Sequence, residues 1–93
     1  MTDLVSELDF LSDADVALIV ERFTKEGIIP DNNQAMALVK KFDLMIEKLG
    51  KWGVTLRWSE PLRCGIHSAV DADLNRAIVE CVAKRQKEKR RDQ

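Results

Sequence analysis

Cys64 and His67 have the residue types and the C-x-x-H spacing at which proteins hold a zinc ion. Structural zinc sites usually combine two such pairs, and this chain has one. Further ligands would have to come from Cys81, Asp71 or Asp73. Cys81 falls on the apolar stripe of a predicted helix, and the two aspartates suit the first turn of that helix, where backbone amides favour carboxylates. We therefore expect no metal site and no cofactor.

A catalytic role for the same Cys and His is not expected either. A Cys nucleophile needs an activating base, a group that orients the base, and an oxyanion donor. The chain has a single His for these tasks. Its glycines, Gly27, Gly50, Gly53 and Gly65, form neither the dinucleotide-binding pattern nor the phosphate-loop pattern. We expect a protein that is not an enzyme.

Large aromatic and guanidinium groups gather between residues 50 and 65, in a chain with two Trp, three Phe and no Tyr. Trp and Arg dominate the energetic centres of protein interfaces. The predicted partner-binding residues are Trp52, Arg57, Trp58 and Arg63. The alternative is that the indole rings close the open end of a helical core. Alternation with Val54 and Leu56 makes Trp58 the more buried ring and Trp52 the more exposed one.

Charge is distributed unevenly along the chain. Residues 1–31 hold eight Asp or Glu against two basic residues, and residues 84–93 hold six Lys or Arg against two acidic ones. The candidate nucleic-acid contacts are Lys84, Arg85, Lys87, Lys89, Arg90 and Arg91. Cations at this position also complement the negative end of a helix dipole, and no aromatic residue among them can stack on bases. Nucleic-acid binding is therefore the second hypothesis.

Two long amphipathic helices are predicted before residue 50. The first spans residues 13–26, with Ser12 as N-cap and Gly27 as its stop. The second has apolar residues at i, i+3 and i+4 spacing over residues 35–49. Phe42 is expected at the middle of its buried stripe.

The period of the apolar residues changes to two over residues 53–59, which predicts one short strand. A strand without a neighbour must pair with a partner or a second copy. Residues 68–71 resemble a capping box and predict the start of a third helix, whose apolar stripe ends at Ala83. Residues 3–11 form a shorter amphipathic segment at the N-terminus.

The predicted fold is all-α: an antiparallel three-helix bundle with a short N-terminal helical segment and one extended excursion between helices two and three. With 93 residues, 45% apolar and 33% charged, residues 1–83 are expected to form a single helical domain. Residues 84–93 then form a basic, solvent-exposed tail. No apolar run approaches the roughly 20 residues of a membrane span, and the N-terminus lacks the pattern of a secretory signal, so we expect a cytoplasmic protein.

The functional hypothesis is a small non-enzymatic regulator, adaptor or inhibitor. It would bind another protein through the excursion that carries Trp and Arg and through polar helix faces. The alternative is a nucleic-acid-associated module that uses the basic C-terminal extension. A homodimer through the unpaired strand is also open.

Overall fold

The computed structural model describes residues 11–91, and within them the chain forms three helices and a three-stranded antiparallel sheet. The fold is therefore α+β, and the prediction of an all-α helical bundle is wrong. The strands β1 (Met45–Leu49), β2 (Lys51–Glu60) and β3 (Arg63–Asp71) overturn it. The predicted N-terminal segment lies outside the described residues except for Leu11, which packs on the core.

The first predicted helix is confirmed as α2 (Asp13–Glu26). The Ser12 hydroxyl accepts a hydrogen bond from the Asp15 amide, and the Asp15 carboxylate accepts one from the Ser12 amide. This capping box satisfies amides that have no partner inside the helix. Gly27 ends the helix at φ 70°, a left-handed conformation that glycine adopts without strain. Val16 is fully buried on the inward side.

The second helix, α3 (Asn32–Phe42), is shorter than predicted. Asp31 caps its start by accepting a hydrogen bond from the Gln34 amide at 2.8 Å. Asp43 then adopts the left-handed conformation, with φ 52° and ψ 52°, and the chain leaves the helix to become β1. Phe42 is therefore the last helical residue, and it is half-buried rather than central in a long stripe.

The strand predicted over residues 53–59 is confirmed as part of β2, which extends it on both sides. β2 is the middle strand, and it pairs antiparallel with β1 and with β3. Gly50 joins β1 to β2 at φ 84°, and the turn at Pro61 and Leu62 joins β2 to β3. The second and third strands thus form a long hairpin.

The third helix begins later than predicted, because residues 68–71 belong to β3. The observed helix is α4 (Leu74–Arg91). The Asp73 carboxylate oxygen Oδ1 accepts hydrogen bonds from the amides of Asn75 and Arg76, at 3.0 and 3.3 Å. Asp73 is therefore the capping residue, and the predicted cap at Ser68 is wrong.

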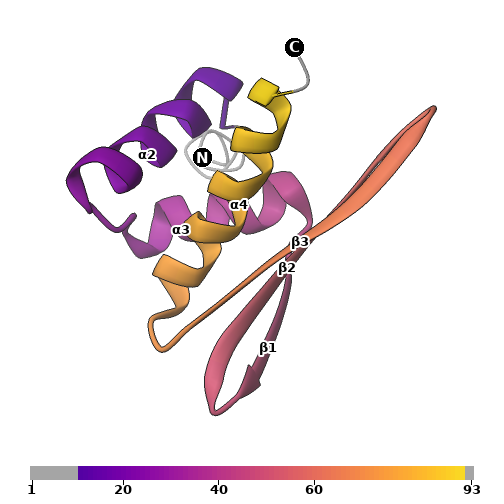
Figure 1. The fold of residues 1–93 in the computed structure, drawn as a ribbon. Coiled ribbons are helices and arrows are strands. Elements are labelled where there is room, and N and C mark those ends of the chain that lie inside the picture. Colours follow the sequence, from indigo (N-terminus) through magenta and orange to yellow (C-terminus); the bar gives the residue numbers. More distant parts are fainter. Residues whose placement is uncertain (1–10, 92–93) are drawn as a thin grey trace, which may run out of the picture.

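The molecule has two layers, with the three helices on one side of the sheet (Figure 1). α4 packs against β2 and β3 and also against α2 and α3, so it joins the sheet to the other helices. The largest fully buried side chains are Leu38, Leu56, Ile78, Val16, Val54, Val79, Val82 and Cys81. No described element covers the opposite side of the sheet.

Candidate functional site

The uncovered side of the sheet is identified by the strand register, because residues that pair across antiparallel strands share a face. The pair of Val54 and Ala69 is buried under the helices. Side chains one residue along each strand point the other way. We call their side the outer face, and it consists of Met45, Glu47, Leu49, Lys51, Gly53, Thr55, Arg57, Ser59, Cys64, Ile66, Ser68 and Val70.

Four large apolar side chains stand on the outer face, and water reaches much of each one. The exposed fractions are 85% for Leu49, 64% for Val70, 62% for Ile66 and 47% for Met45. These side chains come from β1 and β3, so they lie on both sides of the middle strand. Soluble proteins seldom leave such a group uncovered without an interaction that uses it.

A hollow of about 350 Å³ lies on the same face between the outer strands. Its floor contains Gly53, Thr55 and Ser68, whose side chains are absent or short. Leu49 and Val70 form two of its walls. Glu47 and Lys51 also line it, so the outer face is a shallow furrow with both apolar and charged sides.

The four predicted partner-binding residues do not lie together on this face. Arg57 is on it, exposed, and opposite Ile66 in the register. Trp52 and Trp58 project to the inner face and are both half-buried. Trp52 has the Lys48 ammonium 4.8 Å from its ring centre. Trp58 packs against the buried core, whereas Trp52, predicted to be the more exposed ring, is half-buried as well.

Trp58 braces the hairpin against α4. It lies opposite Gly65, and a Cβ atom on Gly65 would come within 2.6 Å of the indole Nε1. The absence of a side chain at Gly65 therefore allows the indole to lie across β3. The Arg85 guanidinium covers the ring at 3.8 Å from its centre, and the Arg63 guanidinium lies 5.6 Å from it. Trp58 and Arg63 thus hold the hairpin in place, and neither stands on the outer face with Arg57.

Arg85 is a structural residue, although the sequence suggested a solvent-exposed tail from residue 84 onward. Its side chain is 7% exposed and forms ion pairs with Glu60 at 3.5 Å and with Glu88 at 3.2 Å. The Lys84 ammonium donates a hydrogen bond to the Ser68 carbonyl oxygen at 2.6 Å. Two of the six candidate nucleic-acid contacts are therefore engaged with the sheet.

The other four basic residues continue along α4. Lys87 and Lys89 are exposed on the helix. Arg90 and Arg91 are helical, and their side chains lie outside the described part of the molecule. The part of the basic run that is described therefore offers two unengaged cations rather than a continuous stripe.

The C-x-x-H pair is separated by the sheet, because residues three apart on a strand point to opposite faces. Cys64 is exposed on the outer face, and His67 projects toward α4. The His67 Nε2 lies 3.4 Å from a Glu88 carboxylate oxygen, within ion-pair distance but without hydrogen-bond geometry. Between residues 11 and 91 no three His, Cys, Asp or Glu side chains gather where a metal ion would fit.

Cys81 is the second thiol, and it is fully buried under the sheet. Its sulfur donates a hydrogen bond to the His67 carbonyl oxygen at 3.3 Å. Burial raises the pKa of this thiol from 9.0 to about 11, outweighing the opposing effects of the Leu56 backbone and the Lys84 charge. The thiol is therefore protonated at neutral pH and shielded from reagents.

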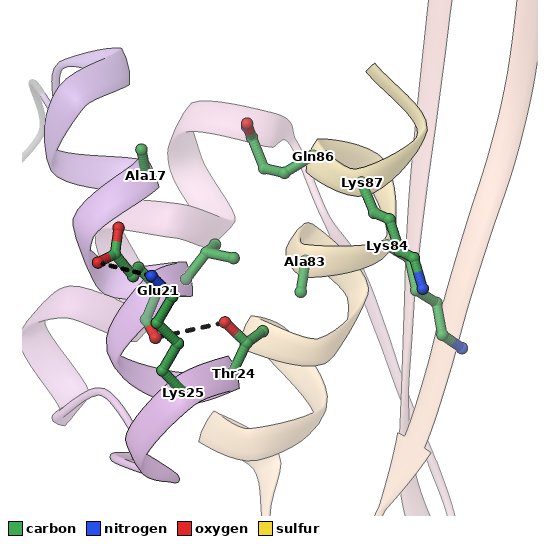
Figure 2. A pocket seen from close by; sticks show the side chains of 9 residues that line it. Ala17, Glu21, Thr24, Lys25, Ala83, Lys84, Gln86 and Lys87 are labelled. Carbon is green, nitrogen blue, oxygen red and sulfur yellow. Dashed lines mark hydrogen bonds and ion pairs between the residues drawn. The ribbon is translucent and has the colours of Figure 1, made fainter. Parts of the chain in front are cut away.

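A crevice of about 440 Å³ lies between α2 and α4 (Figure 2). Ala17, Val20 and Ala83 are among its lining residues. Figure 2 shows that Lys84 and Lys87 extend away from α2. Its polar lining on α2 is engaged within that helix, because the Thr24 hydroxyl donates to the Glu21 carbonyl oxygen and the Lys25 ammonium pairs with the Glu21 carboxylate. The outer face is therefore the stronger candidate site.

Comparisons with protein-family models, with curated proteins and with solved structures found no match to this chain. In the described part of the chain, none of the helices has the length and apolar character needed to cross a membrane. Sequence reasoning missed the four apolar residues of the outer face because it assigned Met45 and Leu49 to one helix and Val70 to another, and placed Ile66 in no helix or strand.

Proposed function

We propose that this protein is a small non-enzymatic regulator, adaptor or inhibitor that binds another protein against the outer face of its sheet. Leu49, Val70, Ile66 and Met45 are exposed together on a sheet face that no described element covers. Burying side chains of this size against a partner removes apolar area from water, which drives protein association.

Arg57 gives this surface a polar anchor. It is exposed on the middle strand, beside Ile66 in the register. An Arg next to an aliphatic side chain is a combination that protein interfaces favour, because the guanidinium can form two hydrogen bonds while its stem packs on apolar atoms. A partner segment with apolar residues and a carboxylate matches this surface.

The packing of the inner face supports the proposal, because it orders the backbone of the strands that carry the outer face. Val54 and Leu56 are packed under the helices, and the indole of Trp58 is covered by Arg85. A surface that is already ordered loses little conformational entropy when it binds. Trp58 therefore contributes to recognition by supporting the strand that carries Arg57.

The test is affinity capture from the native host with a matched set of baits. Ile66→Glu and Arg57→Glu change the outer face, and Leu18→Glu and Lys89→Glu make the same kinds of change on exposed helical positions. Each bait is first shown to be folded by circular dichroism and thermal melting. We expect a host protein that the parent and both helical variants recover and that the two outer-face variants recover at least tenfold less.

Equal recovery of every host protein by the parent and both outer-face variants contradicts the proposal. Nuclease treatment of the same lysate tests the alternative function. If nuclease abolishes recovery and Lys89→Glu reduces it, the binding runs through nucleic acid and the basic residues of α4.

A further inference from the structure

The outer face is complementary to itself about its centre. Its middle row is the cross-strand pair of Thr55 and Ser68, two short polar side chains. One row toward one end is the pair of Gly53 and Val70, and one row toward the other end is the pair of Arg57 and Ile66. The hollow at Gly53, with Val70 as its wall, therefore lies one row from the Thr55–Ser68 pair. The long side chain of Arg57, with Ile66 beside it, lies one row from the same pair in the opposite direction.

A two-fold axis that runs across the strands at the Thr55 row brings these features together. Rotation about it lays each strand antiparallel on its own copy and reverses the order of the rows. Ile66 of one copy then faces Val70 of the second copy, and Met45 faces its own counterpart. The short side chains of the central row permit the spacing of about 10 Å at which sheets pack face to face.

The same rotation matches charges. Arg57 of one copy lies over Gly53 of the second copy, at the hollow. Glu47 lies directly beside Gly53 on the neighbouring strand, whereas Lys51, which also lines the hollow, lies one row further along β2. Neither Arg57 nor Glu47 has an ion-pair partner in the described part of the chain. The rotation therefore gives two equivalent Arg57–Glu47 pairs between the copies, which is the isologous pattern of a closed dimer.

We propose that the protein self-associates through its outer face into a two-fold symmetric dimer, with Ile66 against Val70 and Arg57 paired with Glu47 of the second copy. The inference rests on the proposed function, because it makes self-association the regulator of the same surface. Two copies that cover each other's outer face exclude a partner until they separate.

The size of the face sets the strength of this dimer. The β2–β3 ladder has nine residue pairs, which is about 30 Å at roughly 3.4 Å per residue. Two strands are about 10 Å wide, and β1 adds a third strand over five residues only. The face therefore covers less than about 400 Å² in projection, which is small beside the roughly 800 Å² of accessible surface that each partner buries in a standard stable interface. The dimer is therefore weak, with monomer and dimer in exchange.

Sedimentation equilibrium between about 1 µM and 1 mM tests the dimer. We expect the mass to rise with concentration from 10.6 kDa toward twice that value. Ile66→Glu is expected to keep the chain monomeric over this range, and Arg57→Glu or Glu47→Arg alone to raise the dimer dissociation constant about tenfold or more. The double variant Arg57→Glu with Glu47→Arg restores the pair with reversed signs and is expected to recover most of the lost affinity.

Leu62→Glu is the matched control, because Leu62 is 94% exposed at the hairpin turn and lies outside the rows that the axis superimposes. It is expected to dimerise like the parent.

A parent that stays monomeric at 1 mM overturns the inference. A dimer that persists in Ile66→Glu also overturns it, and so does a charge-reversed double variant whose dimer is no tighter than those of its single variants. A monomeric parent whose Arg57→Glu variant loses the host partner removes the dimer and leaves the proposed function standing. A dimer that the outer-face variants disrupt as predicted, while the same variants recover every host protein as the parent does, supports the dimer and contradicts the proposed function.

Discussion

Gly65→Ala tests the close packing of Trp58 on β3 with the smallest change available. A Cβ atom at this position would lie 2.6 Å from the indole Nε1 and 2.7 Å from two ring carbons. Non-bonded carbon atoms have their optimal van der Waals separation near 3.5 to 4.0 Å, so the indole ring has to move by about 1 Å. Movement is opposed because Arg85 already covers the ring and is itself buried between two ion pairs.

The magnitude follows from two opposing effects. Inserting a methyl group into a packed site costs roughly 1 to 3 kcal/mol. Replacing glycine by alanine also stabilises the folded protein by about 0.4 to 1 kcal/mol, because alanine lowers the conformational entropy of the unfolded chain. Gly65 is not in the positive-φ region, so no backbone strain is added. The net loss in free energy of unfolding is expected to be about 1 to 2 kcal/mol.

Urea unfolding followed by far-ultraviolet circular dichroism measures this loss. With an m value of about 1 to 1.5 kcal/mol per molar urea, the midpoint is expected to fall by about 1 M. Gly53→Ala is the matched control, since Gly53 lies in β2 and the nearest atom to its added Cβ is at 3.8 Å. In a Trp58→Leu background the penalty at Gly65 is expected to vanish, which a double-mutant cycle detects. A Gly65→Ala protein as stable as Gly53→Ala would refute the packing argument.

Three further predictions concern α4. Arg85→Ala is expected to lower the free energy of unfolding by about 2 kcal/mol, because it uncovers the indole and removes the ion pairs to Glu60 and Glu88. Exposed Lys89→Ala is expected to change it by less than about 0.5 kcal/mol in the same urea assay. Asp73→Ala is expected to cost about 1 kcal/mol and Asp73→Asn much less, since asparagine caps helices equally well. For Cys81 burial raises the folded pKa from 9.0 to about 11, so the unfolded chain loses the thiol proton at a lower pH than the folded protein does. The free energy of unfolding is therefore unaffected by this group below pH 9 and is expected to fall by about 3 kcal/mol as the pH rises from 9 to 11. Unfolding curves at pH 8 to 11 should therefore show a shallower alkaline decline for Cys81→Ala than for the parent.

The predicted helix over residues 35–49 shows where sequence reasoning reached its limit. Met45, Ile46 and Leu49 continue the helical spacing set by Ala35 and the residues after it, so the period alone favours one long helix. The same three residues also fit a short strand. The choice is made by Asp43, which adopts a left-handed conformation, and by pairing with β2, an interaction that a local pattern does not contain.

The site was predicted in part. The segment from 50 to 65 was identified by its Trp and Arg residues, and Arg57 does lie on the surface now proposed for recognition. The four apolar residues around it were assigned elsewhere, because a strand pattern over 45–49 or 63–71 becomes visible only once those segments are known to pair. Arg85 was assigned to a solvent-exposed tail since nothing local to residue 85 reveals an indole on β2.

The position of α4 has a consequence for how the chain is made. α2, α3 and the three strands are all synthesised before it, and yet α4 supplies the side chains that join the helices to the sheet, among them Ile78 and Val82. A nascent chain that stops at Asp73 can form the hairpin from local contacts, but Val54 and Leu56 then have no cover. Translation must therefore reach the middle of α4 before the domain can close, and products that end earlier present a bare apolar strand to proteases and chaperones.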